Sequence, residues 1–331
     1  MLNHKILLTT SMLAAAIALS ACQPKQAEPK EEPVAKTPAV VEDLSLKLIG
    51  DSEKLSLALP ECDGNSCPDL SISRLSSNQA FIDEVIDEEI LKKLAQILDV
   101  SPQNLNAQAE QAASDAVASE PAVAQSKAQL ALASVETPKQ KIEQKVAPYL
   151  VNFLALDKEL KALSANHQIS LMIKPRILNA DLPLATVVLN ASSYLGGAHG
   201  SSSQRYYNFD LKQKKQVQLN DIIAPNQKAA LQQKAHEAFR VWIIESKLAD
   251  SVEEYEQAWK FTLSDNFYLS KQGLILQYGE YEIGPYVVGL PRLTIPYDQL
   301  QGILKKEYLP QAEVKDQTVA ASAATVNKAK P

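Results

Sequence analysis

Extended, alternating runs of residues dominate the second half of this chain and limit the folds that it can adopt. "HQISLMIKPRILNAD" and "LATVVLNASSYLGG" read as two strands joined by a turn near "NADLP", and "QRYYNFDLKQKKQVQLNDII" reads as a hairpin with a Gln-Lys-Lys tip. The run "NFYLSKQGLILQYGEYEIGPYVVGLPRLTIPYDQLQGIL" returns to strands, with a hairpin turn at Lys271-Gln272-Gly273. The predicted class is α+β, with mainly antiparallel sheets packed with a few helices in two associated subdomains.

The first half predicts further strands and a helix. "LSLKLIG" and "KLSLALPEC" alternate apolar and polar residues around "DSE", which predicts a hairpin. "DLSISRLS" gives another strand. "NQAFIDEVIDEEILKKLAQILDV" then places its apolar residues near helical spacing. The predicted order is therefore three strands followed by a helix.

Two further helical segments carry local signals of their own. In "TPKQKIEQKVAPYLVNFLALDKELKAL", Thr137 is a plausible N-cap and Pro138 lies in the first turn. Pro148 is expected to kink or divide this helix, because proline cannot donate the backbone hydrogen bond. The residues from Pro225 to Glu256 carry a broad apolar stripe and predict another helix.

Composition divides the chain into five parts. Residues 1–21 read as a signal peptide, and residues 22–43 as a flexible tether of Pro, Lys, Glu and Ala. Residues 44–165 are expected to form an N-terminal α+β subdomain with a low-complexity excursion at 101–136. Residues 166–310 form the C-terminal domain, and residues 311–331 a disordered tail.

The start of the chain predicts its place in the cell. An apolar run from Ile6 to Leu19 ends in Leu-Ser-Ala-Cys, which resembles the lipobox of bacterial lipoproteins and makes Cys22 the lipidated residue. Acyl chains would anchor the protein to a bilayer without spanning it. Gln23 follows in place of the Asp that favours inner-membrane retention. The expected location is the cell envelope, anchored to the outer membrane and facing the periplasm.

The other two cysteines, the histidines and the net charge restrict the disulfides, metals and partners that we expect. Cys62 and Cys67 lie on either side of a turn-forming Asp-Gly-Asn-Ser, and in an oxidising compartment they are expected to form a disulfide. The histidines show no metal-ligand spacing, so neither a metal nor a cofactor is predicted. The net charge of −6, which becomes −7 when the signal and its Lys5 are removed, argues against nucleic acid as a partner. It is compatible with a basic protein partner.

The stretch "SYLGGAHGSSSQRYYNFDL" holds the first candidate site residues. Gly196 and Gly197 indicate a bulge or tight turn, and His199 then sits at the exposed end of a strand. No orienting carboxylate or Gly-x-Ser-x-Gly elbow is evident, so His199 is interpreted as a binding or structural residue and no catalytic residue is assigned. Because Tyr206 and Tyr207 are adjacent, one is expected to face the core and the other solvent or a partner.

A second aromatic stretch, "YGEYEIGPYVVGLPRLTIPY", carries the remaining candidates. Tyr281 and Tyr286 are candidate ligand-binding residues, since amphipathic rings suit recognition of proteins and sugars. Glu280 and Glu282, two apart on a strand, would share one face and are interpreted as a solvated edge, not a glycosidase pair. The backbone motif of this stretch consists of Gly284, Pro285 and Gly289.

Together these stretches carry a family resemblance. "GGAHG", "RYYNFDL", "QVQLNDI" and "YEIGPYVVGLPRLTIPYDQL" resemble the C-terminal domain of the anti-sigma factor RsiV, which also occurs in PdaC-type peptidoglycan deacetylases and in many envelope lipoproteins of unknown function. The likeness spans about Ile169 to Leu304. It implies an extracytoplasmic α+β module, and in RsiV this module binds lysozyme. Neither an anti-sigma segment before a spanning helix nor a deacetylase domain is evident, so both of those activities are disfavoured.

The resulting expectation is a non-enzymatic periplasmic lipoprotein with an RsiV-like module that binds lysozyme or peptidoglycan fragments. Two alternatives remain open. One is an envelope hydrolase that acts on peptidoglycan through His199 with Glu280 or Glu282. The other is a structural or assembly lipoprotein of the outer membrane.

Overall fold

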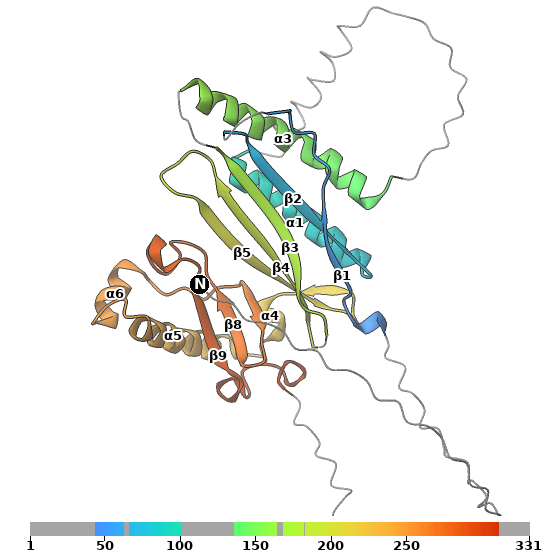
Figure 1. Cartoon of the computed structure of the whole chain (residues 1–331). Helices are drawn as coiled ribbons and strands as arrows, with labels where there is room; N and C mark the ends of the chain where they lie inside the picture. Colours follow the sequence, from blue (N-terminus) through green and yellow to red (C-terminus); the bar gives the residue numbers. More distant parts are fainter. Residues whose placement is uncertain (1–43, 63–65, 101–135, 164–167, 182, 311–331) are drawn as a thin grey trace, which may run out of the picture. The chain divides into compact units, whose positions relative to one another are not determined.

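A six-stranded sheet is the larger of two sheets in the computed structural model, which describes residues 44–62, 66–100, 136–163, 168–181 and 183–310. All of these residues belong to one compact unit, Asp43–Pro331. The strands follow in sequence order across the sheet: β1 (Gly50–Lys54), β2 (Asp69–Ser77), β3 (Ser170–Asn179), β4 (Ala185–Tyr194), β5 (Ser201–Asp210) and β6 (Lys215–Val217) (Figure 1). Only the β2–β3 pair is parallel, so the sheet is mainly antiparallel as predicted.

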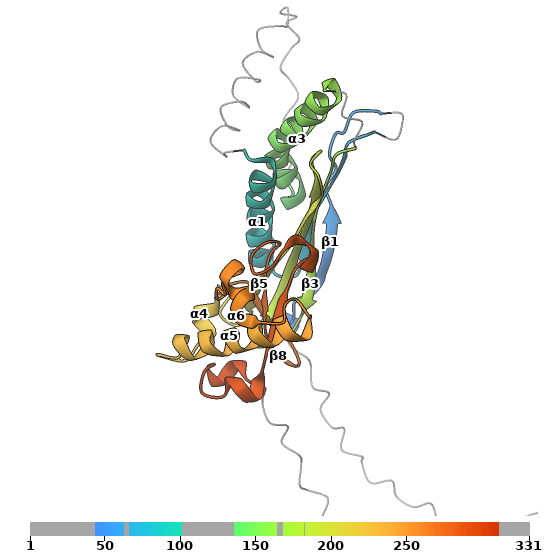
Figure 2. The ribbon, with the colours of Figure 1, turned by 90° about the vertical axis from the view of Figure 1, so that its left-hand side faces the viewer.

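Two long helices cover one face of this sheet. α1 (Ala80–Leu98) and α3 (Pro138–Ala162) contact each other, and α1 contacts β2 and β4. Figure 2 turns the sheet edge-on and shows both helices on the same side of it. Their apolar stripes and the facing strand residues bury the first core, which includes Ile86, Ile90 and Phe153. A short 3₁₀ turn, η1 (Leu44–Leu46), precedes β1.

The start of α3 was predicted correctly from Thr137 and Pro138. The side chain of Thr137 accepts a hydrogen bond from the backbone of Gln140, whose own side chain accepts one from the backbone of Thr137, so the predicted N-cap is part of a full capping box. Pro148 lies inside this one helix, so of the two predicted effects of this residue, a kink or a division, the division does not occur. The Asn152 side chain donates to the Pro148 carbonyl within the uninterrupted helix.

A second, three-stranded sheet contains β7 (Phe267–Leu269), β8 (Gly273–Gln277) and β9 (Arg292–Pro296), all antiparallel. Three helices accompany it: α4 (Leu219–Ile222), α5 (Lys228–Glu245) and α6 (Val252–Ala258). α5 packs on β9 and α6 on α5, burying the second core, which includes Leu231, Phe239 and Tyr278. The single predicted helix from Pro225 to Glu256 is thus two helices. Short 3₁₀ turns complete the region: η2 (Tyr286–Val288), η3 (Tyr297–Leu300) and η4 (Lys306–Tyr308).

Buried amide side chains join the two sheets. Asn266 accepts a hydrogen bond from the backbone of Tyr206 at 2.8 Å and donates to the carbonyl of Gln204 at 2.7 Å. Asn208, on the same strand β5, donates to the carbonyl of Phe267 at 2.8 Å. Buried polar groups need partners, and these two amides find theirs across the junction. The second sheet therefore lies against β5 of the first.

The predicted N-terminal hairpin is wrong. Asp51, Ser52 and Glu53 form the middle of β1 and do not turn, and the partner of β1 is β2. β1 is an edge strand, where polar side chains remain in solvent, so turn-type residues are tolerated there. The predicted division after residue 165 does not separate the sheets either, because strands from both sides of it share the six-stranded sheet.

Several predictions fall on residues that the structure does not describe. They concern the signal peptide, the whole of the tether with Cys22, the predicted excursion at 101–136 except for its last residue, and the tail at 311–331. Cys62 and Cys67 are described and form the predicted disulfide. Among the described residues, none of the helices has the length and apolarity that a membrane span requires.

Candidate functional site

Three aromatic side chains from two distant segments meet at the tip of the β4–β5 hairpin. His199 lies in that tip, and its ring stacks on Tyr286 with 4.0 Å between ring centroids. The Tyr281 hydroxyl lies 3.1 Å from His199 Nε2. The Tyr286 hydroxyl donates to the carbonyl of Gly200 at 2.9 Å. We refer to His199, Tyr281 and Tyr286 as the aromatic cluster; all three were predicted from the sequence as candidate binding residues.

The hydrogen bonds of His199 define its tautomer. Nδ1 lies 2.9 Å from the carbonyl of Gly200, and because a carbonyl only accepts, Nδ1 carries the proton. In the neutral ring Nε2 is then the acceptor of the Tyr281 hydroxyl proton. Both ring nitrogens are therefore engaged by groups that hold the ring in place.

Both segments contain backbone positions at which a side chain would be strained or would clash. Gly196 has φ +85°, and a Cβ there would meet the side chain of Leu160 at 2.9 Å. A Cβ on Gly284 would meet the Tyr255 hydroxyl at 2.6 Å. Tyr281 has φ +62° although it is not glycine, and such left-handed conformations cost free energy and concentrate at functional sites. The loop thus holds the Tyr281 ring beside His199 at a cost in backbone strain.

Glu280 ties the two segments together. It accepts hydrogen bonds from the Ser201 hydroxyl at 2.9 Å and from the backbone N–H of Ser202 at 2.8 Å. Glu282 instead accepts from the backbone of Gly279 within its own turn. The prediction that both acids share a strand face is wrong, because residues 279–284 form a turn. Glu280 therefore joins the start of β5 in the β4–β5 hairpin to the loop that carries Tyr281.

An open groove of about 610 Å³ lies next to the aromatic cluster. We call it the serine groove. Its walls come from the last turns of α1, from β4 and β5, and from the turn at 279–281. Its polar lining comprises Lys93, Gln96, Ser192, Ser193, Ser201, Ser202, Ser203, His199, Glu280 and Tyr281. Sequence reasoning missed the contribution of α1.

Tyr206 and Tyr207, the other two candidate binding residues, are both buried. Tyr207 faces α1 and donates a 2.8 Å hydrogen bond to Glu89; burial raises its pKa. Tyr206 faces the second sheet and stacks on Tyr268 with 4.4 Å between centroids. Because both faces of β5 are covered here, neither ring has a solvent-facing side, and the expectation that one of them faces solvent or a partner is wrong.

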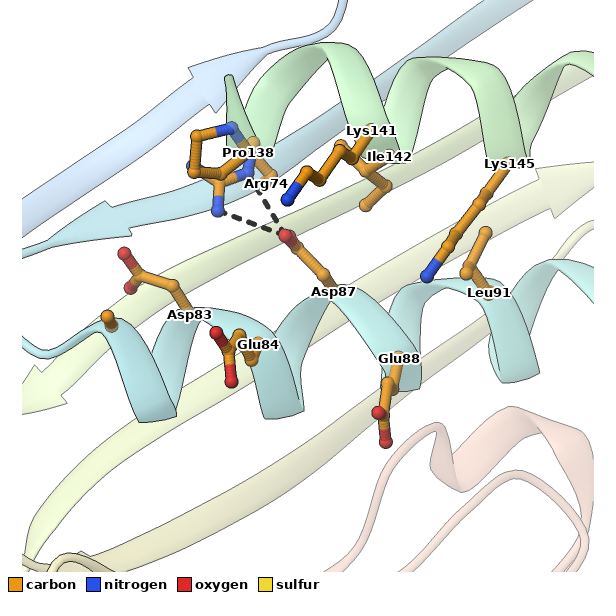
Figure 3. A pocket seen from close by; sticks show the side chains of 11 residues that line it. Arg74, Asp83, Glu84, Asp87, Glu88, Leu91, Pro138, Lys141, Ile142 and Lys145 are labelled. Carbon is orange, nitrogen blue, oxygen red and sulfur yellow. Dashed lines mark hydrogen bonds and ion pairs between the residues drawn. The ribbon is translucent and has the colours of Figure 1, made fainter. Parts of the chain in front are cut away.

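A second cavity, of about 320 Å³, lies between α1 and α3 (Figure 3). Acidic side chains of α1 face Lys141 and Lys145 of α3 across it, and buried Arg74 of β2 donates two hydrogen bonds to Asp87 Oδ2 at 3.2 and 3.0 Å. Burial raises the pKa of the Asp87 carboxyl although Arg74 opposes the shift. Asp83 accepts from both the backbone and the hydroxyl of Ser77. These contacts join α1 to β2, so a structural role explains the charged residues around this cavity.

The described residues contain no group of three or more His, Cys, Asp or Glu side chains placed to hold a metal ion. The fold is that of a two-sheet α+β domain, and the described candidate site consists of an aromatic cluster beside a polar groove.

Comparisons with known proteins found a family match and similar solved structures. Residues 220–298 match the family described as "Protein of unknown function (DUF3298)", a range that contains Tyr281 and Tyr286 but not His199. A crystal structure of a DUF3298 family protein from Pseudomonas aeruginosa PAO1 is 23% identical, with 81% of this chain and 98% of that chain covered and a TM-score of 0.55. A DUF3298 family member from Bacteroides fragilis NCTC 9343 is 18% identical over 78% of this chain and 93% of that one, with a TM-score of 0.49. No curated protein matches.

The chain therefore carries a DUF3298 match and has the fold of a solved DUF3298 family protein. The likeness to the C-terminal domain of RsiV goes further than these comparisons and stays a prediction.

Proposed function

We propose that this chain is a non-enzymatic ligand-binding lipoprotein of the cell envelope, anchored through Cys22 and facing the periplasm. The observation that carries the proposal is the aromatic cluster. Two segments about 80 residues apart are held together so that Tyr281 and Tyr286 remain 49% and 37% exposed. Large rings fixed at a surface contribute binding energy with little loss of side-chain entropy, which is the property of interface hot spots.

Lysozyme is the first ligand to test. The loop that carries Tyr281 and Tyr286 also exposes 87% of Val287, so a partner protein would meet aromatic and aliphatic groups side by side. The chain carries a net charge of −6, which would accelerate encounter with a basic protein such as lysozyme. The resemblance to RsiV supports the same ligand.

A peptidoglycan fragment is the second candidate, and the serine groove favours it. Saccharides present hydroxyl and amide groups that hydrogen-bond to hydroxyl side chains, and ring faces that pack on aromatic residues. The groove offers several serine hydroxyls with Tyr281 at one end. Its volume lies within the range of small-ligand sites.

The geometry disfavours the hydrolase alternative. In a histidine triad a carboxylate accepts the Nδ1 proton, but Nδ1 of His199 donates to the carbonyl of Gly200 instead. Glu280 is held by Ser201 and Ser202 and does not orient the histidine. We expect the parent protein to show no turnover of peptidoglycan, and turnover that disappears in His199→Ala would contradict this proposal.

Calorimetry on residues 43–331, the compact unit, tests the proposal directly. Lysozyme and purified muropeptides are titrated at low and at physiological salt. Lysozyme binding should weaken with salt, because charge steering is screened. Silence with both ligands would overturn the proposal.

Two variants locate the protein-binding surface. Val287→Ser replaces an apolar side chain that is 87% exposed, and it should weaken lysozyme binding about fivefold or more if this loop is a hot spot. Val151→Ser is the matched control, because Val151 is 65% exposed on α3. Equal effects of the two substitutions would show that the loop is not the docking surface.

A further inference from the structure

Three of the serines that line the serine groove, Ser193, Ser201 and Ser203, share one face of the sheet. Ser193 pairs with Ser201 across β4 and β5, and Ala191 pairs with Ser203. Side chains alternate along a strand, so Ser193 lies on the same face as Ala191, which belongs to the first core beneath α1. Within the described residues, the Ser193 and Ser203 hydroxyls make no protein hydrogen bond, whereas the Ser201 hydroxyl is held by Glu280. Two hydroxyls are thus free to bind a ligand.

Among the residues that the structure describes, Lys93 is the one lysine or arginine that lines this groove. It extends from α1 and donates a 2.8 Å hydrogen bond to the neutral side chain of Gln96. No carboxylate lies within 4.0 Å of its ammonium group in the part of the chain that the structure describes. The neighbouring lysine, Lys92, does have such a partner, since it pairs with Glu89 at 2.6 Å.

The surroundings of Lys93 disfavour its positive charge unless an anion lies beside it. Burial lowers the pKa of its ammonium group, and the positive charge of Arg205 lowers it further. The guanidinium of Arg205 is itself paired with Asp265, at 2.8 Å. Glu280, the acid that lines the groove, has both carboxylate oxygens engaged by Ser201 and Ser202. A half-buried cation beside a polar groove therefore lacks an anionic partner that a ligand can provide.

We infer that the serine groove binds a saccharide that carries a carboxylate, with the carboxylate against Lys93, hydroxyl or amide groups on Ser193 and Ser203, and a ring face toward Tyr281. This inference rests on the proposed function, because it takes the groove as a ligand site, and it names the ligand class. The single charge of Lys93 matches the single charge of a carboxylate, whereas the described lining offers no second Lys or Arg to balance the double charge of a phosphate monoester. An amino sugar with a lactyl ether has the required groups.

Three small probes test the inference on residues 43–331 by titration monitored through backbone amide NMR shifts. N-acetylmuramic acid carries the sugar and the carboxylate, N-acetylglucosamine lacks the carboxylate, and lactate lacks the sugar. We expect N-acetylmuramic acid to bind at least tenfold more tightly than either of the others and to shift amides of the groove, and its affinity should fall with added salt whereas that of the uncharged N-acetylglucosamine should not.

Lys93→Gln removes the charge and should abolish the difference between the two sugars, whereas Lys93→Arg should retain most of it. The matched control is Lys92→Gln, one residue earlier on the same helix, where the side chain is 66% exposed, pairs with Glu89 and does not line the groove. It should leave the preference unchanged.

The outcomes separate this inference from the proposed function. Equal binding of both sugars, with no effect of Lys93→Gln, would overturn the role of the carboxylate while leaving a glycan-binding module. Binding of lysozyme without binding of any saccharide probe would overturn the inference and retain the protein-binding function. Binding of lactate as tightly as N-acetylmuramic acid would show that the groove recognises a carboxylate alone and would also overturn it.

Discussion

Replacement of Tyr281 by glycine should separate stability from binding at the aromatic cluster. Tyr281 has φ +62°, and a left-handed conformation costs a residue with a Cβ about 1–2 kcal/mol. Tyr281→Ala and Tyr281→Gly lose the same ring contacts, which are the 3.1 Å hydrogen bond to His199 and the stacking on Tyr286 at 5.7 Å between centroids. Only the glycine variant also loses the backbone strain.

The expected difference between the two variants follows from two opposing effects. Relief of strain favours glycine by about 1–2 kcal/mol, and the greater freedom of glycine in the unfolded chain opposes it by about 0.4–1 kcal/mol. The Gly variant should therefore be about 1 kcal/mol more stable than the Ala variant. Both should bind the ligand much more weakly than the parent, since the exposed ring is gone.

Urea unfolding followed by tryptophan fluorescence measures this difference. Trp242 and Trp259 both pack against the second core, and Trp242 lies beside Gly284 in the loop that carries Tyr281. Gly289→Ala is the control, because Gly289 has φ +65° and a Cβ there would meet nothing within 4 Å. It should lose stability by strain alone. If Tyr281→Gly proves no more stable than Tyr281→Ala while Gly289→Ala is destabilised, the assignment of strain to Tyr281 is refuted.

Three further measurements probe the first core and the disulfide. Burial raises the pKa of Asp83 above its ordinary 3.8, so its contribution to stability is complete below that pH and is lost as the pH rises through the folded-state pKa; in Asp83→Asn the unfolding free energy should therefore fall less, or rise more, from pH 3 to pH 7 than in the parent, and an identical pH dependence would contradict this. Tyr207→Phe removes the hydrogen bond to Glu89 and should cost about 1–2 kcal/mol in urea unfolding, whereas no loss would show that water replaces the hydroxyl. Reduction of the Cys62–Cys67 disulfide should cost no more than about 2 kcal/mol, because the closed loop is short, and a larger drop in the urea midpoint would assign it a role beyond loop closure.

Elements with complete local signals could be predicted from the sequence. α1 follows from the spacing of Ile82, Ile86 and Ile90, which are fully buried in the structure. The start of α3 follows from Thr137, whose capping box needs only residues within one turn. Such signals depend only on neighbouring residues in the chain, so they can be recognised without knowledge of the tertiary structure.

Elements decided by distant partners could not be predicted. Asp51-Ser52-Glu53 has the composition of a turn, but its partner strand begins at Asp69 and draws it into the sheet edge. Likewise, the alternation at Tyr206 and Tyr207 predicts one exposed ring, and only the packing of the second sheet on β5 buries both.

The candidate site shows the same limit. His199 and Tyr281 are each recognisable as unusual residues beside glycines, but their hydrogen bond joins positions 82 residues apart. Lys93 has no sequence signal that distinguishes it from Lys92. What separates these two lysines is the face of α1 on which each lies, since only the face of Lys93 meets the groove.

The single parallel pair in the large sheet has a consequence for how the chain folds. β3 to β6 pair with strands next to them in sequence, but Asp69 of β2 pairs with Ser170 of β3, about a hundred residues later, and closure of so long a loop is slow. We expect amides of β4 and β5 to gain protection from hydrogen exchange before those of β2, and simultaneous protection in a pulse-labelling experiment would argue against this order. During synthesis, β1 and β2 emerge first but join the sheet last. The N-terminal strands therefore cannot complete their pairing until β3, in the later half of the chain, has been made.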